Sequence, residues 1–333
     1  MICIFSSIDD YSTTDVMKWL HHFGKEVIRV NSNEGISNDS MKIDISNETF
    51  SFQLDGRTIR LNEIEAVWYR KGSNWLCDLF YPVSVDDHQG FTNYLNYKLK
   101  VEEARLSEYL HYIIENTVPF LGSSTKGDLN KLLVLSAAKN VGLLVPDFYI
   151  SNHKEGIGRV FDQAPDLITK SISDGLYQFD NTDKNTGYFT FTEKVDHQST
   201  TDLADRFSPS FLQKNIHKKY EVRVFFLDGE CFSMAILSQM DEQTKIDFRK
   251  YNEKKPNRFV PFLLPDDIDN KIKSLFGKLD LNTGSVDLMV DQEDDFYFLE
   301  INPVGQFGMV SSPCNYFLEK KVALNLIQRC KKI

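Results

Sequence analysis

The sequence has little of what membrane and secreted proteins carry, and these absences narrow its class. No apolar run approaches the roughly 20 residues that a membrane-spanning helix needs. The opening "MICIFSSIDD" has no basic segment followed by a long apolar one, so it predicts a first strand rather than a signal peptide. We therefore expect a soluble, cytoplasmic protein with no membrane partner.

The sequence also lacks closely spaced cysteines and has fewer basic than acidic residues. The five cysteines are scattered, with no C-x-x-C pair and no spacing to histidine that suits a metal, so neither a disulfide framework nor a zinc site is expected. The net charge of -10 argues against general nucleic-acid binding, because that binding depends on neutralising phosphates with Lys and Arg. An anionic partner would need a local basic patch.

Two common catalytic motifs are missing as well. There is no G-x-S-x-G elbow, which argues against a serine hydrolase of that type. The first turn, "FSSIDDYST", lacks G-x-G-x-x-G, so a flavodoxin-like or dinucleotide-binding dehydrogenase has little support.

What is present begins with alternating elements. The 333 residues, 41% hydrophobic and 26% charged, suit about two or three globular domains. Strand, helix and strand patterns follow one another at residues 2–5, 12–24 and 26–30, which predicts an open α/β sheet. A hairpin is expected around Asp55-Gly56, and a long helix with one apolar side over residues 91–115, before a boundary near Pro119.

The middle and last thirds of the chain mix strands and helices. A helix capped near Asp128 and stopped by Gly142 is expected before a strand that follows Pro146. Further strands are expected at 166–170 and 186–195, and the polar, turn-rich segment 171–187 is expected to be mobile. Later patterns predict two strands around Asp228-Gly229, a helix over 266–281, a hairpin over 284–302 and a C-terminal helix from about residue 315.

The hairpin near residue 300 carries the clearest chemical signal. In "YFLEINPVGQFG", Glu300 and Asn302 lie two positions apart on a strand and therefore share a face. If Asp287 pairs with Glu300, residues 293 and 294 form a two-residue turn and all three oxygen-bearing side chains lie together. Two carboxylates and an amide suit Mg²⁺, which also takes nucleotide phosphates. The alternative is the solvated face of an amphipathic hairpin.

This hairpin resembles the metal-binding end of the ATP-grasp ligases. The resemblance implies a mixed α/β (α+β) ATP-grasp fold that binds ATP and Mg²⁺. It also implies three parts: an N-terminal open α/β domain of the pre-ATP-grasp type (1–118), a small central subdomain (119–212) and a C-terminal subdomain with the metal site (213–333).

The resemblance also assigns roles to residues. Lys131, before a G-x-x-x-P stretch, and Lys170, at the end of a strand, match the two lysines that contact the phosphates. Metal ligands would be Asp287, Glu300 and Asn302. A hinge segment that contacts adenine in the family corresponds here to Gln213, Lys214 and Ile216. The acid that accepts hydrogen bonds from the ribose hydroxyls corresponds to Glu221. The two arginines that face the transferring phosphoryl group correspond to Arg223 and Arg249.

One feature departs from the family pattern. The glycine-rich loop that commonly covers the phosphates is reduced here to Gly175 and Gly187. The residues that would contact phosphate from this loop are therefore not assigned.

Three stretches narrow the resemblance further. "AVWYRKG", "DFRKYN" and "FLEINPVGQFGMVSSPCNYFLEKKVA" resemble graspetide (microviridin-like) peptide maturases, particularly those of grasp-with-SPASM systems. That group joins Glu or Asp side chains of a ribosomal precursor peptide to Thr or Ser hydroxyls or Lys amines, and it implies a leader, an acidic core and a homodimer. Cations in "QKNIHKK" and "RKYNEKKPNR" would attract the acidic core, and Arg70 and Lys71 would line its entrance.

Two other functions stay open at this stage. A related ATP-grasp ligase could add free amino acids to a protein or small-molecule carboxylate, which would increase a mass by a residue. A synapsin-like regulator would bind ATP without turnover, but such a protein would not need the two arginines and three metal ligands.

Overall fold

The computed structural model forms two compact units, each described by itself below. The first unit comprises Met1–Asp128, Leu281–Gly284 and Pro303–Ile333, and the second comprises Leu129–Asp280 and Ser285–Asn302. The described residues are 1–31, 43–47, 49–54, 56–71, 82–85, 88–173, 175, 177–180, 186–190, 192–196, 200–201, 203–238 and 257–330.

A parallel sheet forms the centre of the first unit. Its strand order is β2-β1-β6-β7, with bounds Val27–Asn31, Ile2–Ser6, Ala66–Tyr69 and Phe120–Leu121. Every residue of β1 is buried, as expected for the central strand of a covered parallel sheet. The helix α1 (Tyr11–His22) joins β1 to β2; the Asp10 side chain caps its start, and Gly24 follows its end at a φ of 71°. The expected β-α-β opening is confirmed.

Smaller elements flank this sheet. An antiparallel sheet contains β3 (Ile43–Ser46), β4 (Thr49–Leu54) and β5 (Arg57–Arg60), and a 3₁₀ turn follows at Leu61–Glu63. Leu54 pairs with Arg57, which confirms the expected hairpin, although Asp55 itself lies outside the described residues.

Three helices complete the first unit. These are α2 (Gln89–Thr117), α7 (Gly308–Cys314) and α8 (Leu318–Cys330). The expected long helix is confirmed as α2, with Leu110 and Ile113 buried. The expected C-terminal helix begins at Leu318, after the separate short helix α7. Because α8 packs against α1 and β6, the end of the chain belongs to the first unit's core.

The second unit contains a small sheet with one helix. Its strand order is β12-β9-β13-β8, with bounds Glu193–Val195, Leu167–Lys170, Arg206–Lys214 and Phe148–His153. The helix α4 (Lys154–Gln163) packs on β8 and buries Ile157 and Phe161. A separate hairpin pairs β10 (Tyr177–Asp180) with β11 (Thr186–Phe189). The segment expected to be a mobile loop therefore contains a strand.

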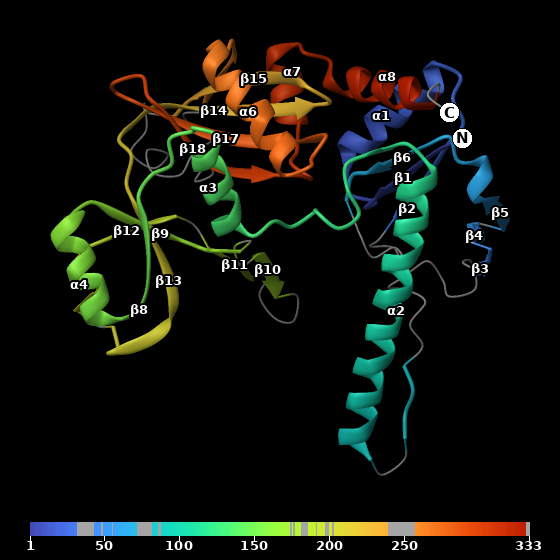
Figure 1. Cartoon of the computed structure of the whole chain (residues 1–333), viewed down its shortest axis with the longest axis horizontal. Coiled ribbons are helices and arrows are strands. Elements are labelled where there is room, and N and C mark those ends of the chain that lie inside the picture. The colour runs from blue at the N-terminus through green and yellow to red at the C-terminus, as the bar shows by residue number, and fades with distance from the viewer. Residues whose placement is uncertain are drawn as a thin grey trace. The chain divides into compact units, whose positions relative to one another are not determined.

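A larger five-stranded sheet forms the rest of the second unit (Figure 1). Its order is β16-β15-β14-β17-β18, with bounds Arg258–Phe262, Glu230–Leu237, Lys218–Leu227, Thr283–Asp291 and Phe296–Asn302. The helix α6 (Asp266–Lys278) covers it through Phe276, whose ring stacks on Phe226 with centroids 3.9 Å apart. The helix α3 (Lys131–Asn140) packs against β18 and α6.

The start of α3 differs slightly from its expected position. The Asn130 side chain, rather than Asp128, caps the helix by accepting from the main-chain N–H groups of Leu132 and Leu133. Lys131 is consequently the first helical residue. Gly142 follows the helix at a φ of 84°, as its predicted stop requires.

The expected three domains stay a prediction. The two units are defined by contacts between residues. By this definition the segments Leu281–Gly284 and Pro303–Ile333 belong to the first unit. Among the helices that the structure describes, none combines the length and the apolar composition that crossing a membrane requires.

Candidate nucleotide and metal site

The β17–β18 hairpin holds the predicted metal ligands. Asp287 pairs with Glu300 across the two strands, and Ser285 pairs with Asn302, so the expected pairing is confirmed. Directly paired residues on antiparallel strands project to the same side of the sheet. The carboxylates of Asp287 and Glu300 are partly exposed, at 20% and 40%, whereas the neighbouring Val286 is fully buried.

The expected two-residue turn is wrong, and a bulge explains why. After Asp287 and Glu300 the register shifts, so that Leu288 pairs with Phe298 and Leu299 is the extra residue. An unbroken register would place Phe298 on the same face as Glu300, yet Phe298 is fully buried. The bulge resolves this conflict, and the turn becomes three residues long, closed by the hydrogen bond from Asp291 N–H to the Asp295 carbonyl.

Each of the two carboxylates forms an ion pair with a cation from another element. Arg223 on β14, the strand next to β17, places Nη1 2.5 Å from Asp287 Oδ2. Lys131 at the start of α3 places Nζ 3.6 Å from Glu300 Oε2. Two acids and two bases, partly shielded from water, thus form a cluster of two ion pairs.

The cluster also reaches the small sheet. Lys131 Nζ donates to the Ser171 carbonyl at 2.8 Å, directly after Lys170 at the end of β9. Lys170 lies over the Phe211 ring, with Nζ 5.9 Å from the centroid. Beside it is a cavity of about 380 Å³, lined by Thr169, Lys170, Ser171, Ile172, Thr190, Glu193, Pro209, Ser210 and Phe211. Lys131 therefore contacts the main chain of the residue that follows Lys170.

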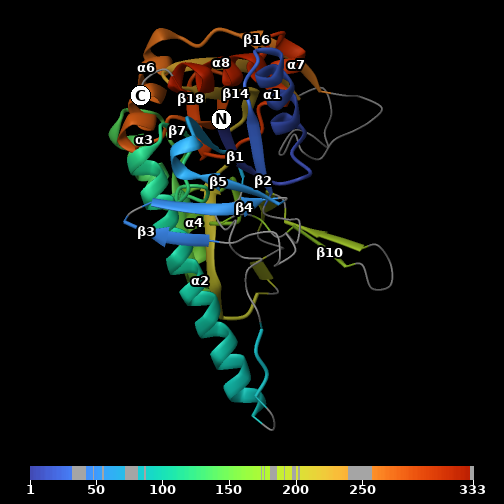
Figure 2. The same cartoon turned by 90° about the vertical axis from the view of Figure 1, so that its right-hand side faces the viewer.

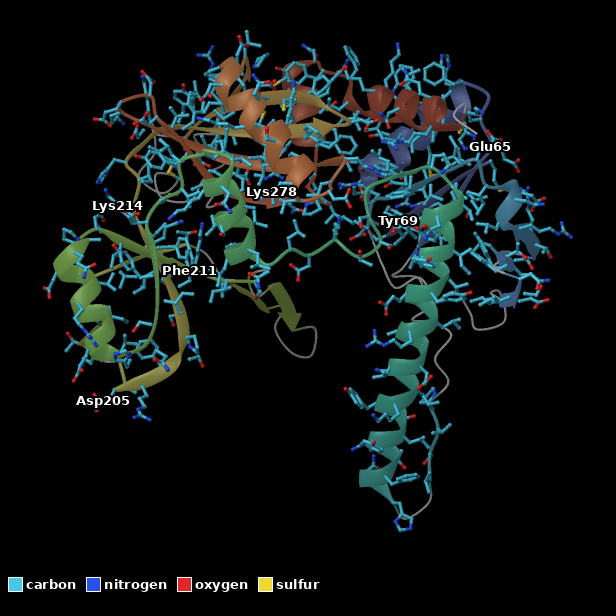
Figure 3. All side chains as sticks on the ribbon, in the orientation of Figure 1. Glu65, Tyr69, Asp205, Phe211, Lys214 and Lys278 are labelled. Carbon is cyan, nitrogen blue, oxygen red and sulfur yellow. The ribbon has the colours of Figure 1, made fainter. Side chains whose placement is uncertain are left out.

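The predicted adenine segment begins with the last two residues of β13, the strand that Figure 3 marks with Phe211 and Lys214. Gln213 is 1% exposed, and its side-chain Nε2 has no hydrogen-bond partner in the described part of the chain. Lys214 N–H donates to the Asp147 carbonyl at 2.8 Å. An adenine contact from Lys214 would therefore use its carbonyl, alongside the N–H of Ile216.

Glu221, the predicted ribose acceptor, is buried and forms an ion pair with Lys218. The Lys218 side chain is only 2% exposed, so this cation is enclosed in the protein and does not contribute to a surface patch. A buried ion pair of this kind is costly to break from one side, because the remaining charge is left without compensation. Lys218 therefore fixes the carboxylate of Glu221.

In the described part of the expected basic patch, two of the basic side chains lie beside acids. Lys219 pairs with Asp294 at 2.7 Å, and His217 Nε2 lies 3.1 Å from Asp166 Oδ2. Arg249, predicted to face the transferring phosphoryl group, lies outside the described residues, as does most of the second basic stretch.

The expected position of Arg70, at the substrate entrance, is wrong. The residue is 3% exposed; its Nε lies 2.9 Å from Asp10 Oδ2, and it donates to the carbonyls of Val304 and Gly305. Its guanidinium also lies over the Phe307 ring, 5.3 Å from the centroid. Arg70 is a buried core residue of the first unit.

Three residues of the site were not identified from the sequence. Lys218 holds Glu221, Ser285 pairs with Asn302, and Asp166 contacts the segment after β13. Of these, only Ser285 could have been predicted from the sequence, because it lies two positions before Asp287 on the same face of the strand. Its Oγ is buried and has no hydrogen-bond partner among the described residues.

The chemistry of these donors fits Mg²⁺ better than a softer metal. In the part of the chain that the structure describes, no three His, Cys, Asp or Glu side chains gather as a metal site. Two carboxylates with an amide supply hard oxygen ligands and leave positions for water and phosphate, which is how Mg²⁺ is usually bound. Asp287, Glu300 and Asn302 would hold such an ion.

Thiol catalysis has no support among the described cysteines. Burial raises the pKa of Cys3 to about 12, and burial also raises the pKa values of Cys231, Cys314 and Cys330. A thiol with a raised pKa forms little thiolate, which is the nucleophilic species. These four thiols are therefore poor candidates for a catalytic nucleophile.

Comparison with known proteins identifies the fold. Residues 1–79 match the family described as the MvdD pre-ATP grasp domain, and a search of curated proteins found no match. Macrocyclase MdnC from Microcystis aeruginosa MRC, solved with precursor peptide MdnA, is 25% identical with a TM-score of 0.78, covering 98% of this chain and 99% of its own.

Two further structures resemble the chain over nearly its full length. A Chryseobacterium gregarium RiPP-associated ATP-grasp ligase, solved with ADP and a leader and core peptide, is 22% identical (TM-score 0.77; 100% of this chain and 97% of that one). ATP-grasp ligase PsnB, solved with a minimal precursor, Mg and ADP, is 16% identical (TM-score 0.74; 99% and 97%). The chain therefore has the ATP-grasp ligase fold with a pre-ATP-grasp domain, as expected.

Proposed function

We propose that this protein is an ATP-dependent peptide macrocyclase. It would join Glu or Asp side chains of a ribosomal precursor peptide to Thr or Ser hydroxyls or to Lys amines, as graspetide maturases of grasp-with-SPASM systems do. The precursor peptide bound to MdnC and the leader and core peptide bound to the Chryseobacterium ligase support a peptide substrate, for which we expect a leader and an acidic core.

The observation that carries the proposal is the paired arrangement of Asp287 with Arg223 and of Glu300 with Lys131. Nucleotide phosphates and Mg²⁺ bring charges of both signs to such a cluster. Phosphate oxygens would take Lys131 and Arg223 as partners, while the released carboxylates would hold the metal. The cluster thus contains cations for the phosphates and carboxylates for Mg²⁺ before either ligand binds.

Buried polar atoms without partners point to the same ligand. Gln213 Nε2 and Arg223 Nε are buried and have no hydrogen-bond partner in the described part of the second unit. A buried donor without a partner costs about 1–3 kcal/mol, so its presence calls for a reason. Adenine near Gln213 and a phosphoryl oxygen near Arg223 would supply the missing acceptors.

The reaction has two balanced steps. A peptide carboxylate oxygen attacks the γ-phosphorus of ATP, the bond to the β-phosphate oxygen breaks, and ADP leaves with an acyl phosphate formed. The hydroxyl or amine then attacks the acyl carbon, phosphate leaves, and the attacking group loses its proton. One ester or amide forms for each ATP converted to ADP and phosphate.

The residues of the chain would bind and orient the reactants during both steps. Lys131 and Lys170 would hold phosphate oxygens, and Arg223 with Arg249 would stabilise charge on the transferred phosphoryl group. Glu221, fixed by Lys218, would accept from the ribose hydroxyls. A bound Mg²⁺ would supply further charge neutralisation of the phosphates.

The test uses intact masses and ADP release. The purified full chain is incubated with ATP, Mg²⁺ and candidate acidic precursor peptides encoded beside its gene. We expect a loss of about 18 Da per ring, each coupled to one ADP. A mass increase by an amino-acid residue would instead identify an amino-acid ligase, and nucleotide binding without turnover would favour the regulator.

A matched pair of variants links turnover to the site. Glu300→Gln removes a carboxylate that pairs with Lys131, whereas Glu293→Gln changes an exposed acid in the turn of the same hairpin. Turnover should be lost in the first variant and retained in the second. Full activity of Glu300→Gln would refute the metal assignment.

A further inference from the structure

Ser285 is a buried hydroxyl on the strand that carries a predicted metal ligand. It lies on β17, two positions before Asp287, and is 1% exposed. Its Oγ has no hydrogen-bond partner in the part of the chain that the structure describes. A buried hydroxyl with no partner destabilises the folded state, and most buried side-chain polar atoms in proteins have one. The hydrogen bonding of the described chain therefore does not account for a serine at this position.

The register of the hairpin places this hydroxyl beside the predicted amide ligand. Ser285 is directly opposite Asn302 on β18, and the register shift comes only after the next pair on the same face, Asp287 with Glu300. The sheet that holds these pairs can be followed in Figures 1 and 2 by its strands β14 and β18. Directly opposed residues have their Cβ atoms about 4.5–5.5 Å apart, so an amide and a hydroxyl at these positions are within reach of each other. Asn302 is exposed, which leaves its amide accessible to an incoming ion.

An asparagine that binds a metal must present the correct end of its amide. The oxygen is an acceptor and can bind Mg²⁺, whereas the NH₂ group carries two donors and cannot. The two ends have nearly the same shape, so an acceptor that holds the NH₂ group decides which end faces the ion. A hydroxyl oxygen is such an acceptor and adds no charge to the site. Removing a group that orients a metal ligand commonly weakens metal binding by about 10- to 100-fold.

We propose that Ser285 is a positioning residue for the metal site. When metal and nucleotide bind, Asn302 Nδ2 donates to Ser285 Oγ, and Asn302 Oδ1 faces the ion. The buried hydroxyl thereby gains the partner that it lacks among the described residues, while Ser285 itself contacts neither the ion nor the phosphates. This inference rests on the proposed function only through the metal ligands, because it concerns binding of the ion and not the carboxylate that is activated.

Binding of Mn²⁺ to the full chain in the presence of ADP tests this role without turnover. Mn²⁺ prefers the same oxygen ligands as Mg²⁺, and the electron paramagnetic resonance signal of the free ion gives its Kd. Ser285→Ala should raise this Kd by about tenfold. The Tm of the same variant without metal should not fall, because alanine removes a hydroxyl that has no partner among the described residues. An unchanged Kd for Ser285→Ala would overturn the proposal.

Ser233 provides a matched control on the same sheet. It is also buried, but it pairs with Val224 and therefore lies on the other face of the sheet from Arg223. Its Oγ donates to the Phe262 carbonyl at 2.7 Å. Ser233→Ala should consequently lower the Tm and leave the Kd of Mn²⁺ unchanged, the opposite of the result expected for Ser285→Ala. If the two variants change both quantities alike, the role of Ser285 is only structural and the proposal is wrong.

A double-mutant cycle with Asn302→Asp tests how Ser285 acts. The two oxygens of a carboxylate are equivalent and need no orientation. In the Asn302→Asp background, Ser285→Ala should therefore change the Kd of Mn²⁺ by less than about twofold. A loss that is still tenfold would show that Ser285 acts on the ion or the phosphates directly, which would refute the positioning role.

These outcomes are separate from those of the ring-formation assay. A protein that binds Mn²⁺ with ADP in the expected pattern but forms no ring would refute the macrocyclase function and support the positioning role. Ring formation together with an unaffected Kd in Ser285→Ala would refute the positioning role alone.

Discussion

At the residue scale, Arg223 and Lys131 each form an ion pair with one carboxylate of the β17–β18 hairpin. The pairs differ in geometry: the guanidinium of Arg223 lies 2.5 Å from Asp287, whereas the ammonium of Lys131 lies 3.6 Å from Glu300 and also donates to Ser171. A planar guanidinium can bind two oxygens at once, and an ammonium acts as a point charge. Substitutions at the two sites should therefore have different effects.

Replacing Arg223 with Lys should lower kcat by about 100-fold while changing the KM for ATP much less. The charge is retained, but the forked donor that would face the transferred phosphoryl group is lost. Steady-state ADP release measures both constants, and Arg258→Lys on β16 is the exposed control. An unchanged kcat would show that the Arg223 guanidinium does not stabilise the transition state.

Glu65 gives a pH-dependent prediction in the first unit. A hydrogen bond from the Met1 amino group, and a second from Lys25, lower the pKa of Glu65 from its ordinary 4.5 to about 2. Because the folded pKa is below the unfolded one, the stabilisation is full above about pH 4.5 and is lost as the pH falls towards 2. The side chain is 44% exposed, so water screens the effect and keeps it small.

Glu65→Gln should accordingly lower the Tm of the first unit near neutral pH. The difference from the unmodified protein should shrink as the pH approaches 2. Tryptophan fluorescence can follow it, since all three tryptophans lie in this unit's chain segment, and Asp15→Asn, which removes an exposed ion pair on α1, is the control. A difference that stays constant with pH would show that ionisation of Glu65 is not involved.

At the level of elements, the segment that follows β13 depends on Asp166. Its carboxylate lies 3.1 Å from both Asn215 Nδ2 and His217 Nε2 and 3.2 Å from Lys194, and its carbonyl accepts from Asn215 N–H at 3.0 Å. These contacts set the conformation of the segment that contains Ile216. The segment is held in place by Asp166 rather than by helix or strand hydrogen bonding.

Asp166→Asn should raise the Kd of ATP by about tenfold, the effect of losing roughly 1.4 kcal/mol of hydrogen bonding to a charged group. It should leave kcat nearly unchanged, because Asp166 positions the adenine segment and does not contact the phosphoryl group. Binding of a fluorescent nucleotide gives the Kd, and Asp162→Asn on the exposed side of α4 is the control. A fall in kcat with an unchanged Kd would contradict this role.

Local patterns predicted many of the elements because their physical causes are local. The alternation around Asp228-Gly229, the stop of α3 at Gly142, and the pairing of Asp287 with Glu300 all follow from neighbours in sequence. The bulge at Leu299 was not predicted because it depends on the burial of Phe298 in the folded core, which the local sequence pattern does not reveal. Lys218 and Arg70 appeared to be surface cations because sequence spacing does not reveal burial.

At the scale of the whole molecule, nucleotide binding should act on one unit. All the described residues of the candidate site lie in the second unit, so ATP with Mg²⁺ should slow hydrogen exchange there. The expected stabilisation at 100 times Kd is about 2.7 kcal/mol. Amides of β13, β14, β17 and β18 should show it, whereas amides of α1 and α8 should not.

Removing the metal provides the control for this prediction. EDTA should abolish most of the protection given by ATP, since the hairpin carboxylates would then face the phosphates without a cation between them. Glu300→Gln should show little change on EDTA treatment. Equal protection with and without Mg²⁺ would argue that the nucleotide binds away from the β17–β18 hairpin.

The return of the chain to the first unit after Asn302 has a consequence for synthesis. The buried residues Leu318, Val322, Ala323 and Leu326 of α8 complete a core that begins with β1 and α1. The ribosome makes every residue of the second unit before it makes this helix. The unit whose translation starts first therefore finishes folding last. A nascent chain released after the β17–β18 hairpin would contain every described residue of the candidate site but would leave α1 and β6 uncovered by α8.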